Sequence, residues 1–321
     1  MQQGVFSRDR PLFVVQNPGS GRANAGEARR TIAEVLTLAG QRHEFRVPEK
    51  SSEVARAARV ARRDAEAADG AVVVAGGDGT LRAVAEAVLG SPCPFGVIPQ
   101  GTFNYFARAQ GIPEDLAEAT RALVGATTRP VQVGRVNERV FLVNASVGLY
   151  PELLEERESV KQRFGRSRLV AVAAGIKTLL GEHRSLLLEV EHAGVKRVVR
   201  TPTLVVDNNR LQLEQLGVPE AQVVEEGRLA AFTVKEEGAA ALLGVAARGA
   251  LGQLAEADAV TRFVFRTLVV RPRFPLRRRR IKVATDGEVA FLRVPLRFQV
   301  ARERLSLLVP PQEPDAEAPA E

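Results

Sequence analysis

The sequence predicts a doubly wound α/β domain at residues 11–129, followed by a mostly antiparallel, β-rich domain at residues 130–309. Three observations support this prediction. Strand and helix patterns alternate in the first part, Gly-rich loops end several of its strands, and strand patterns follow one another directly after Pro130. The chain has 321 residues, 45% of them hydrophobic, which is enough for two domains with cores of their own.

The elements of the first domain follow from the spacing of its apolar residues. Short apolar runs predict strands at residues 12–15, 43–47, 71–75 and 95–98. Helical spacing between these runs predicts helices at 27–39, 51–68, 80–89, 103–110 and 114–124. This order of elements is typical of a parallel sheet, in which ligands bind beyond the carboxyl ends of the strands.

The second domain contains more strands than helices. Strands are expected at 131–136, 139–144, 186–191, 196–206, 227–234, 262–270, 280–284 and 288–293. Helices are expected at 151–162, 168–180 and 238–254. The last strand of this domain is a candidate to return to the first domain. Residues 1–10 and the Pro-, Ala- and acid-rich residues 310–321 are expected to be disordered.

Composition excludes several classes of protein. A single cysteine, Cys93, excludes an internal disulfide, and three scattered histidines give little support to a His-based metal site. No apolar run reaches the ~20 residues of a membrane span, and residues 1–10 lack the apolar core of a signal peptide. We therefore expect a cytoplasmic protein. The net charge of +7, with 39 arginines and six lysines, indicates a polyanionic partner.

The most informative segment is the loop Gly76-Gly77-Asp78-Gly79-Thr80, which follows a buried strand and precedes a helix that starts with Leu81. Glycines let backbone amides approach an anion closely, and a helix N-terminus adds partial positive charge. A tight βα turn would also use glycine. Three glycines within four residues, together with Asp78 and Thr80, favour a phosphate site.

Two further loops follow strands of the same expected sheet. Asn17-Pro18-Gly19-Ser20-Gly21 follows the first strand, and Gln100-Gly101-Thr102-Phe103-Asn104 follows the fourth. Alone, the first is an ordinary turn pattern and the second a helix cap by Thr102. Three loops of this kind at successive strand ends favour a common phosphate site.

The second domain holds one acidic motif and one basic run. Asp286-Gly287-Glu288 is a hairpin signal, and either carboxylate could also accept a proton from an attacking hydroxyl. Residues 271–280 contain six arginines. They fit a solvated loop or a contact with anionic lipid headgroups equally well.

Together these motifs resemble the diacylglycerol kinase catalytic domain family, which includes bacterial lipid kinases and sphingosine kinases. The matching strings begin at Asn17, Gly76 and Gly101, the last continuing through Phe106-Ala107-Arg108, and Asp286-Gly287-Glu288 matches the late acidic motif. The resemblance covers roughly residues 11–309. It implies a β-sandwich as the second domain, a nucleotide cleft between the domains, and transfer of the γ-phosphoryl group of ATP, with Mg²⁺, to the hydroxyl of diacylglycerol or a similar lipid.

The resemblance also implies roles for individual residues. Asp78 would act on Mg²⁺ through water, and Glu288, with Asp286 beside it, would accept the proton. The ATP-binding residues would be Asn17, Pro18, Gly19, Ser20, Gly21, Gly76, Gly77, Asp78, Gly79, Thr80, Leu81, Thr102 and Asn104. The implied location is cytoplasmic, with peripheral contact to the inner, anionic face of the membrane. Nucleic acid is not an expected partner, and no pattern indicates an oligomeric state.

Two positions depart from the family pattern. Tyr105 stands where many members have aspartate, which suggests a non-catalytic nucleotide- or lipid-binding regulator as an alternative. Bacterial members often bind a structural Mg²⁺ through an Asp-Gly turn and nearby carbonyls. The similar stretch here contains Val223, Glu226 and Arg228, with Glu226 in place of aspartate. Because Gly-Gly-Asp-Gly-Thr also occurs in NAD kinases, an NAD kinase-like enzyme is a further alternative.

Overall fold

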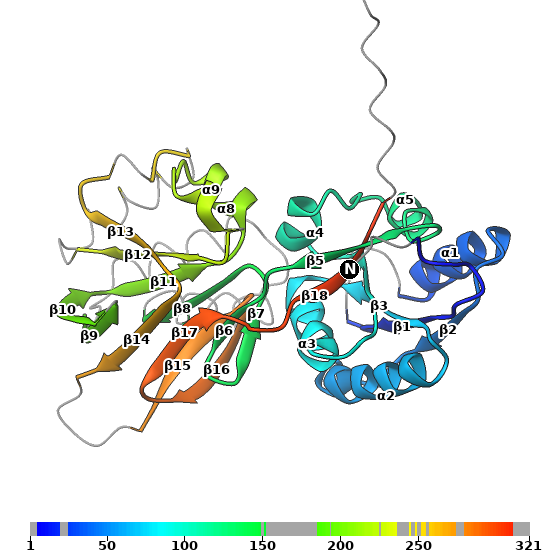
Figure 1. The fold of residues 1–321 in the computed structure, drawn as a ribbon, viewed down its shortest axis with the longest axis horizontal. Coiled ribbons are helices and arrows are strands. Elements are labelled where there is room, and N and C mark those ends of the chain that lie inside the picture. Colours follow the sequence, from blue (N-terminus) through cyan, green and yellow to red (C-terminus); the bar gives the residue numbers. More distant parts are fainter. Residues whose placement is uncertain are drawn as a thin grey trace, which may run out of the picture. The chain divides into compact units, whose positions relative to one another are not determined.

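The computed structural model describes residues 5–19, 25–148, 151, 185–192, 194–224, 226–235, 244, 248, 252–254, 257–273 and 279–310. The chain forms two compact units (Figure 1): Met1–Val131 with Glu303–Glu321, and Gln132–Arg302. The helices expected at 151–162 and 168–180, most of the one expected at 238–254, and residues 311–321 lie outside the described residues.

The first unit is built on a six-stranded sheet in the order β2-β1-β3-β4-β18-β5. The strands are β1 (Leu12–Gln16), β2 (His43–Arg46), β3 (Ala71–Gly76), β4 (Phe95–Pro99), β5 (Thr127–Val131) and β18 (Leu305–Val309). β1 to β4 are parallel, and β18 pairs parallel with β4 and antiparallel with β5. Every residue of β1, β3 and β4 is buried, as their continuous apolar runs indicate for a sheet covered on both faces.

Helices cover both faces of this sheet. They are α1 (Ala25–Leu38), the short 3₁₀ helix η1 (Ser51–Glu53), α2 (Val54–Ala67), α3 (Asp78–Val88), α4 (Tyr105–Ala109) and α5 (Leu116–Arg121). In Figure 1, α2 and α3 lie side by side on one face, and α1 and α5 pack together on the other. The expected doubly wound class is confirmed. Strand order reverses between β1 and β3, so the loops that follow these strands lie at the switch point.

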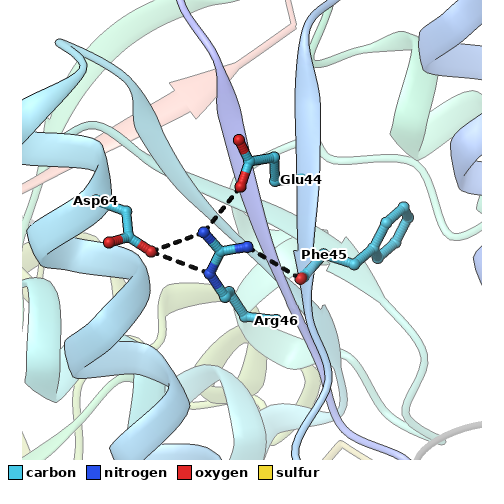
Figure 2. Close-up of polar contacts among 4 residues, drawn as sticks. All are labelled: Glu44, Phe45, Arg46 and Asp64. Atoms are coloured by element: carbon cyan, nitrogen blue, oxygen red, sulfur yellow. Dashed lines mark hydrogen bonds and ion pairs between the residues drawn. The ribbon is translucent and has the colours of Figure 1, made fainter.

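Arg46 ties the edge strand β2 to helix α2 (Figure 2). Its Nε and Nη2 atoms lie 3.0 and 2.8 Å from Asp64 Oδ2, Nη2 lies 2.8 Å from Glu44 Oε2, and Nη1 donates to the Phe45 carbonyl. The forked contact with Asp64 joins an edge strand that has only one neighbouring strand to the covering helix.

The N-terminal segment corrects one expectation. Residues 5–10, which the sequence suggested to be disordered, pack on the first unit. Val5 bridges Thr127, the Phe6 N–H donates to the Ala126 carbonyl at 2.7 Å, and the Phe6 side chain is buried. One buried phenyl ring and an edge pairing order this segment despite its polar composition.

The second unit contains two six-stranded sheets, in the orders β10-β9-β14-β17-β6-β7 and β13-β12-β11-β8-β15-β16. The strands of the first are β6 (Gly134–Val136), β7 (Arg139–Phe141), β9 (Leu186–His192), β10 (Val195–Thr201), β14 (Thr267–Pro272) and β17 (Leu296–Val300). Those of the second are β8 (Asn144–Gly148), β11 (Thr203–Asp207), β12 (Leu229–Val234), β13 (Val260–Phe265), β15 (Arg280–Thr285) and β16 (Glu288–Arg293). Neighbouring strands are antiparallel, and one apolar core takes side chains from both sheets, which confirms the β-sandwich.

Three of the expected strands are wrong in the same way, because each one is two strands. The expected strand 196–206 breaks at Pro202 into β10 and β11, which belong to different sheets, and proline cannot donate a ladder hydrogen bond. The expected strand 262–270 likewise breaks at Arg266 into β13 and β14. The expected strand 131–136 ends the first unit as β5 and restarts in the second as β6. A continuous apolar pattern does not reveal a change of sheet.

Two short helices, α8 (Arg210–Gln215) and α9 (Ala221–Val224), were not expected. Their buried side chains Leu213 and Val224 form a small second core with Ala230 of β12. The Asn209 side chain caps α8 by accepting from the Gln212 N–H at 2.8 Å. No helix within the described ranges is both long and apolar enough to cross a membrane.

Candidate functional site

In the first unit, Asn17 joins the loops that follow β1 and β3 at the switch point. Its Nδ2 donates to Thr80 Oγ1 at 2.9 Å, while its Oδ1 accepts from the Gly19 N–H at 3.1 Å and from Ser51 Oγ at 2.7 Å. The side chain therefore connects the loop after β1, the first turn of α3 and the start of η1. Ser20 and Gly21, also expected here, lie outside the described residues.

The loops that follow β3 and β4 approach each other through two glycines. A Cβ atom on Gly77 would lie 3.2 Å from Gly101 Cα, and one on Gly101 would lie 2.9 Å from Gly77 Cα. The Gln100 N–H donates to the Gly76 carbonyl at 2.9 Å. These glycines are therefore required for close backbone approach, and a side chain at either position would push the two loops apart.

Asn104 fixes the shape of the third loop. Its Oδ1 accepts from the Gly101 N–H at 2.8 Å, and its Nδ2 donates to the Gly101 carbonyl at 3.2 Å. Asn104 is buried and has a φ of +49°, a left-handed conformation that asparagine tolerates better than most residues. Since both ends of its amide are used inside the loop, Asn104 acts by positioning Gly101 and Thr102.

Asp78 is the first residue of α3 and faces the start of α4. The Phe106 N–H donates to Asp78 Oδ1 at 3.5 Å. Burial raises the pKa of the Asp78 carboxyl, and hydrogen bonds from the backbone of Phe106, Tyr105 and Asn104 act in the opposite direction. The Asp78 carboxylate thus connects the loop after β3 to the loop after β4. We call the loops that follow β1, β3 and β4, at residues 17–19, 76–80 and 100–104, the loop cluster.

Tyr105, the departure from the family pattern, stacks on Phe103. The two ring centroids are 5.7 Å apart with an interplanar angle of 11°, and 47% of Phe103 is exposed. No pattern in the sequence indicated this aromatic pair, because alternate residues of a loop share no regular face.

In the second unit, Asp286 has a different environment from the one expected. Its Oδ2 accepts from the Leu142 N–H at 2.7 Å, and its Oδ1 accepts from the Val143 and Asn144 N–H groups at 2.9 and 3.0 Å. The residue is buried and has a φ of +48° in the turn between β15 and β16. Three amides therefore engage this carboxylate, which holds the connection between β7 and β8.

Glu288 begins β16 and is exposed. Its partner across the hairpin is Thr285, which is fully buried and whose Oγ1 accepts from Arg139 Nε at 2.7 Å. Of the two carboxylates in the late acidic motif, Glu288 is the one that solvent and a substrate can reach.

A second buried carboxylate, Asp207, lies near Asp286. It ends β11, and its Oδ1 accepts from the Asn209 N–H at 2.7 Å. Its Oδ2 is buried and has no hydrogen-bond partner among the described residues. Burial raises the pKa of the Asp207 carboxyl well above its usual range, and the Asp286 charge adds to the rise. Sequence reasoning missed this residue, because a lone aspartate at a strand end carries no signal.

A side-chain amide lies at the stretch expected to hold a structural Mg²⁺. Gln132 Nε2 donates to the Val224 and Arg228 carbonyls at 2.7 and 2.9 Å and to Asn208 Oδ1 at 2.7 Å. Glu226 is exposed. An amide from a distant part of the chain therefore binds two carbonyls of this turn, those of Val224 and Arg228. Over the described ranges, no group of three or more His, Cys, Asp or Glu side chains could hold a metal.

Comparison with solved structures supports the fold. The chain superimposes on a diacylglycerol kinase from Bacillus anthracis (strain Sterne) with a TM-score of 0.67 and 18% identity, covering 94% of this chain and 97% of that one. A second crystal structure from the same organism gives a TM-score of 0.71 at 19% identity, covering 94% of this chain and 98% of that one. At these identities, the likeness concerns the fold.

Comparison with known sequences defines the family. Residues 11–136 match the model of the diacylglycerol kinase catalytic domain. The chain is 32% identical over 185 residues to the diacylglycerol kinase of Bacillus subtilis, covering 56% of this chain and 59% of that protein. It is 39% identical over 98 residues to the "Probable lipid kinase YegS-like" of Klebsiella pneumoniae, covering 29% of this chain and 33% of that protein.

The resemblance inferred from the loops is confirmed, since residues 11–136 match the diacylglycerol kinase catalytic domain. The aligned parts span about a third to three fifths of the length of these curated relatives. All the described loops after β1, β3 and β4 lie within the matched residues.

Proposed function

We propose that this protein is a lipid kinase that transfers the γ-phosphoryl group of ATP, with Mg²⁺, to the hydroxyl of diacylglycerol or a similar lipid. The observation that carries the proposal is the loop cluster of the first unit. Asn17 bonds Thr80, Gly77 packs on Gly101, and Asp78 faces α4. Three loops at the carboxyl ends of adjacent strands thus form one linked arrangement.

The loop cluster is suited to the phosphates of ATP. The first N–H groups of α3, from Asp78 to Thr80, have no acceptor within the helix, and α3 is long enough for its dipole to favour an anion at this end. Thr102 is exposed at the third loop, where its N–H and hydroxyl can donate. Asn17 and Asn104 would hold these donors in place rather than contact the nucleotide.

Asp78 fits the expected Mg²⁺. Kinase sites hold this ion through one or two carboxylates, water and phosphate oxygens, so a single aspartate beside a phosphate loop is sufficient. When bound, the ion would neutralise charge on the transferred phosphoryl group. Hydrogen bonds from the start of α4 fix the orientation of Asp78. We do not extend this proposal to a second ion at Val223, Glu226 and Arg228.

Glu288 is the proposed proton acceptor. As the lipid oxygen bonds to the γ-phosphorus, the hydroxyl proton passes to Glu288, the bond from the γ-phosphorus to the bridging oxygen breaks, and ADP leaves. Glu288 is exposed, whereas three backbone amides engage Asp286. We therefore propose that Asp286 positions the turn and does not exchange the proton.

The test is a substrate panel with ³²P-labelled ATP. Purified protein is incubated with Mg²⁺ and mixed micelles of diacylglycerol, sphingosine or ceramide, and separately with NAD. Labelled diacylglycerol or a related lipid is the expected product. Labelled NADP formed from NAD at an equal or higher rate would replace the proposal by an NAD kinase activity.

The stacked pair Phe103 and Tyr105 favours one alternative, a non-catalytic nucleotide- or lipid-binding regulator. This alternative predicts that the protein binds ATP, measured by calorimetry, without labelling any acceptor in the panel. It also predicts that Tyr105→Asp restores no turnover. Turnover by the wild-type protein would exclude it.

A further inference from the structure

The outward side of the β15–β16 hairpin combines one exposed aromatic ring with cations. Phe291 is 59% exposed and lies on β16, one of the two edge strands of its sheet (Figure 1). Lys282 lies opposite Phe291 in the hairpin, with its Nζ 5.8 Å from the ring centroid. Arg280 lies opposite Arg293, and both are exposed.

The fold of the second unit does not require this ring. Side chains alternate along the hairpin, so Ile281 and Val283 enter the sandwich core and Leu292 packs against it, while Phe291 points outward. A single exposed apolar residue is common and needs no explanation. An exposed phenyl ring that shares the face of an edge strand with three cations suits a partner that is both apolar and anionic.

Two charges of this surface, those of Arg280 and Arg293, are exposed. Neither Arg280 nor Arg293 forms an ion pair with another described residue, whereas Arg271 and Arg273 on β14 pair with Glu189 and Glu191. In the sequence, Arg277 and Arg278 lead into this hairpin. Arginines bind lipid phosphates through paired N–H groups, and aromatic rings settle at the level of the headgroups.

We propose that the outward face of the β15–β16 hairpin docks on an anionic phospholipid bilayer. This inference rests on the proposed lipid kinase function and adds the element that meets the membrane. The turn of the same hairpin carries Glu288, three residues from Phe291 and so about 10 Å along the strand. Because side chains alternate along the strand, Glu288 lies on the side of β16 opposite to Phe291. Docking at Phe291 would still bring the turn that carries the proton acceptor to within about 10 Å of the bilayer surface.

Vesicle sedimentation of the full chain tests the inference. Vesicles of phosphatidylcholine with about one third phosphatidylglycerol are compared with pure phosphatidylcholine at low and high salt. We expect Arg280→Gln with Arg293→Gln to lower the partition coefficient on anionic vesicles about 25-fold, since each basic contact contributes roughly fivefold. We expect Phe291→Ser to lower it about tenfold on the same vesicles.

The matched control removes the same charge elsewhere. Arg29→Gln with Arg30→Gln changes two exposed arginines of α1, and Leu38→Ser changes an exposed apolar residue of the same helix. These variants should bind vesicles like the wild type. An equal loss of binding in the control and hairpin variants would overturn the inference, because net charge alone would then explain attraction to the membrane.

Two further measurements separate the remaining outcomes. Sedimentation velocity would overturn the inference if Phe291→Ser converted a dimer to a monomer without changing vesicle binding, because β16 would then pair with a second copy. Turnover of a short-chain diacylglycerol in solution, measured on the wild type without vesicles, tests the kinase function itself. If turnover were absent and vesicle binding intact, the proposed kinase function would be wrong, and the inference about membrane docking would stand.

Discussion

The loop cluster of the first unit and the β15–β16 turn of the second differ in the groups that they leave exposed to a ligand. In the loop cluster, Asp78 accepts from one helix start while glycines and the N-terminus of α3 offer N–H donors. In the turn, Asp286 engages three N–H donors and leaves Glu288 as the exposed acceptor. A surface of donors suits phosphates, and an exposed carboxylate suits a proton. The proposed function therefore assigns phosphate binding to the first unit and proton acceptance to the second.

The largest expected effect tests this division directly. Glu288→Gln and Asp78→Asn should each lower kcat by about 10² to 10³, because the first removes the proton acceptor and the second the metal-linked charge. Steady-state kinetics on the wild type, both variants and the control Glu27→Gln would measure this. Thermal unfolding should be unchanged in all of them. Unchanged turnover in both variants would remove the proposed mechanism.

Asp286→Ala should affect stability instead. Loss of this carboxylate leaves the buried N–H groups of Leu142, Val143 and Asn144 without their acceptor, at a cost of about 3 kcal/mol in the free energy of unfolding. Urea denaturation measures it, with Glu288→Gln as the matched variant two residues away. A stable Asp286→Ala protein without turnover would show that Asp286 has a chemical role and that the contrast with Glu288 is wrong.

Gln132→Leu should cost about 2 kcal/mol of stability, because it leaves the Val224 and Arg228 carbonyls unpaired. The Asp78→Asn variant lacks the proposed ligand of the catalytic ion, so any remaining effect of Mg²⁺ on its stability would come from a second site. Addition of EDTA or Mg²⁺ should leave the melting temperature of this variant unchanged. A melting temperature that fell with EDTA and recovered with Mg²⁺ would support a structural ion at Val223, Glu226 and Arg228.

The smallest expected effect concerns pH. The folded state raises the pKa of Asp207, so it holds a proton that the unfolded chain releases above about pH 4. Stability should therefore fall as pH rises above this value, and Asp207→Asn should flatten that fall. Melting temperatures from pH 4 to pH 8 for both proteins measure the difference in slope. Parallel curves would show that Asp207 is not protonated in the fold.

Local patterns predicted much of the first unit. Continuous apolar runs marked β1, β3 and β4, and the Gly-rich strings after them marked the loops, because backbone preference and burial act over a few neighbouring residues. The strands of the second unit were harder to predict from the sequence. At Pro202 and Arg266 the chain changes sheets within one apolar pattern, and this depends on two sheets packing together.

The roles of single side chains were also hard to predict, because they depend on contacts between distant parts of the chain. Asp286 and Glu288 stand two residues apart and are equivalent as acidic residues in a hairpin signal. Only the amides of Leu142 to Asn144, more than 140 residues earlier in the chain, distinguish them. Gln132 had no pattern at all, and its partner carbonyls Val224 and Arg228 are 92 and 96 residues away.

The amino-acid sequence by itself predicts a phosphate loop at Gly76 to Thr80, because glycine spacing and a following helix are properties of adjacent residues. The folded chain alone shows the bond from Asn17 to Thr80, 63 residues apart, and the contrast between the hydrogen-bonded Asp286 and the exposed Glu288. Hydrogen bonds between distant residues form only after strand order and sheet packing have brought the partners together. Local chemistry therefore decided which groups are present, and tertiary packing decided which of them remain available to a substrate.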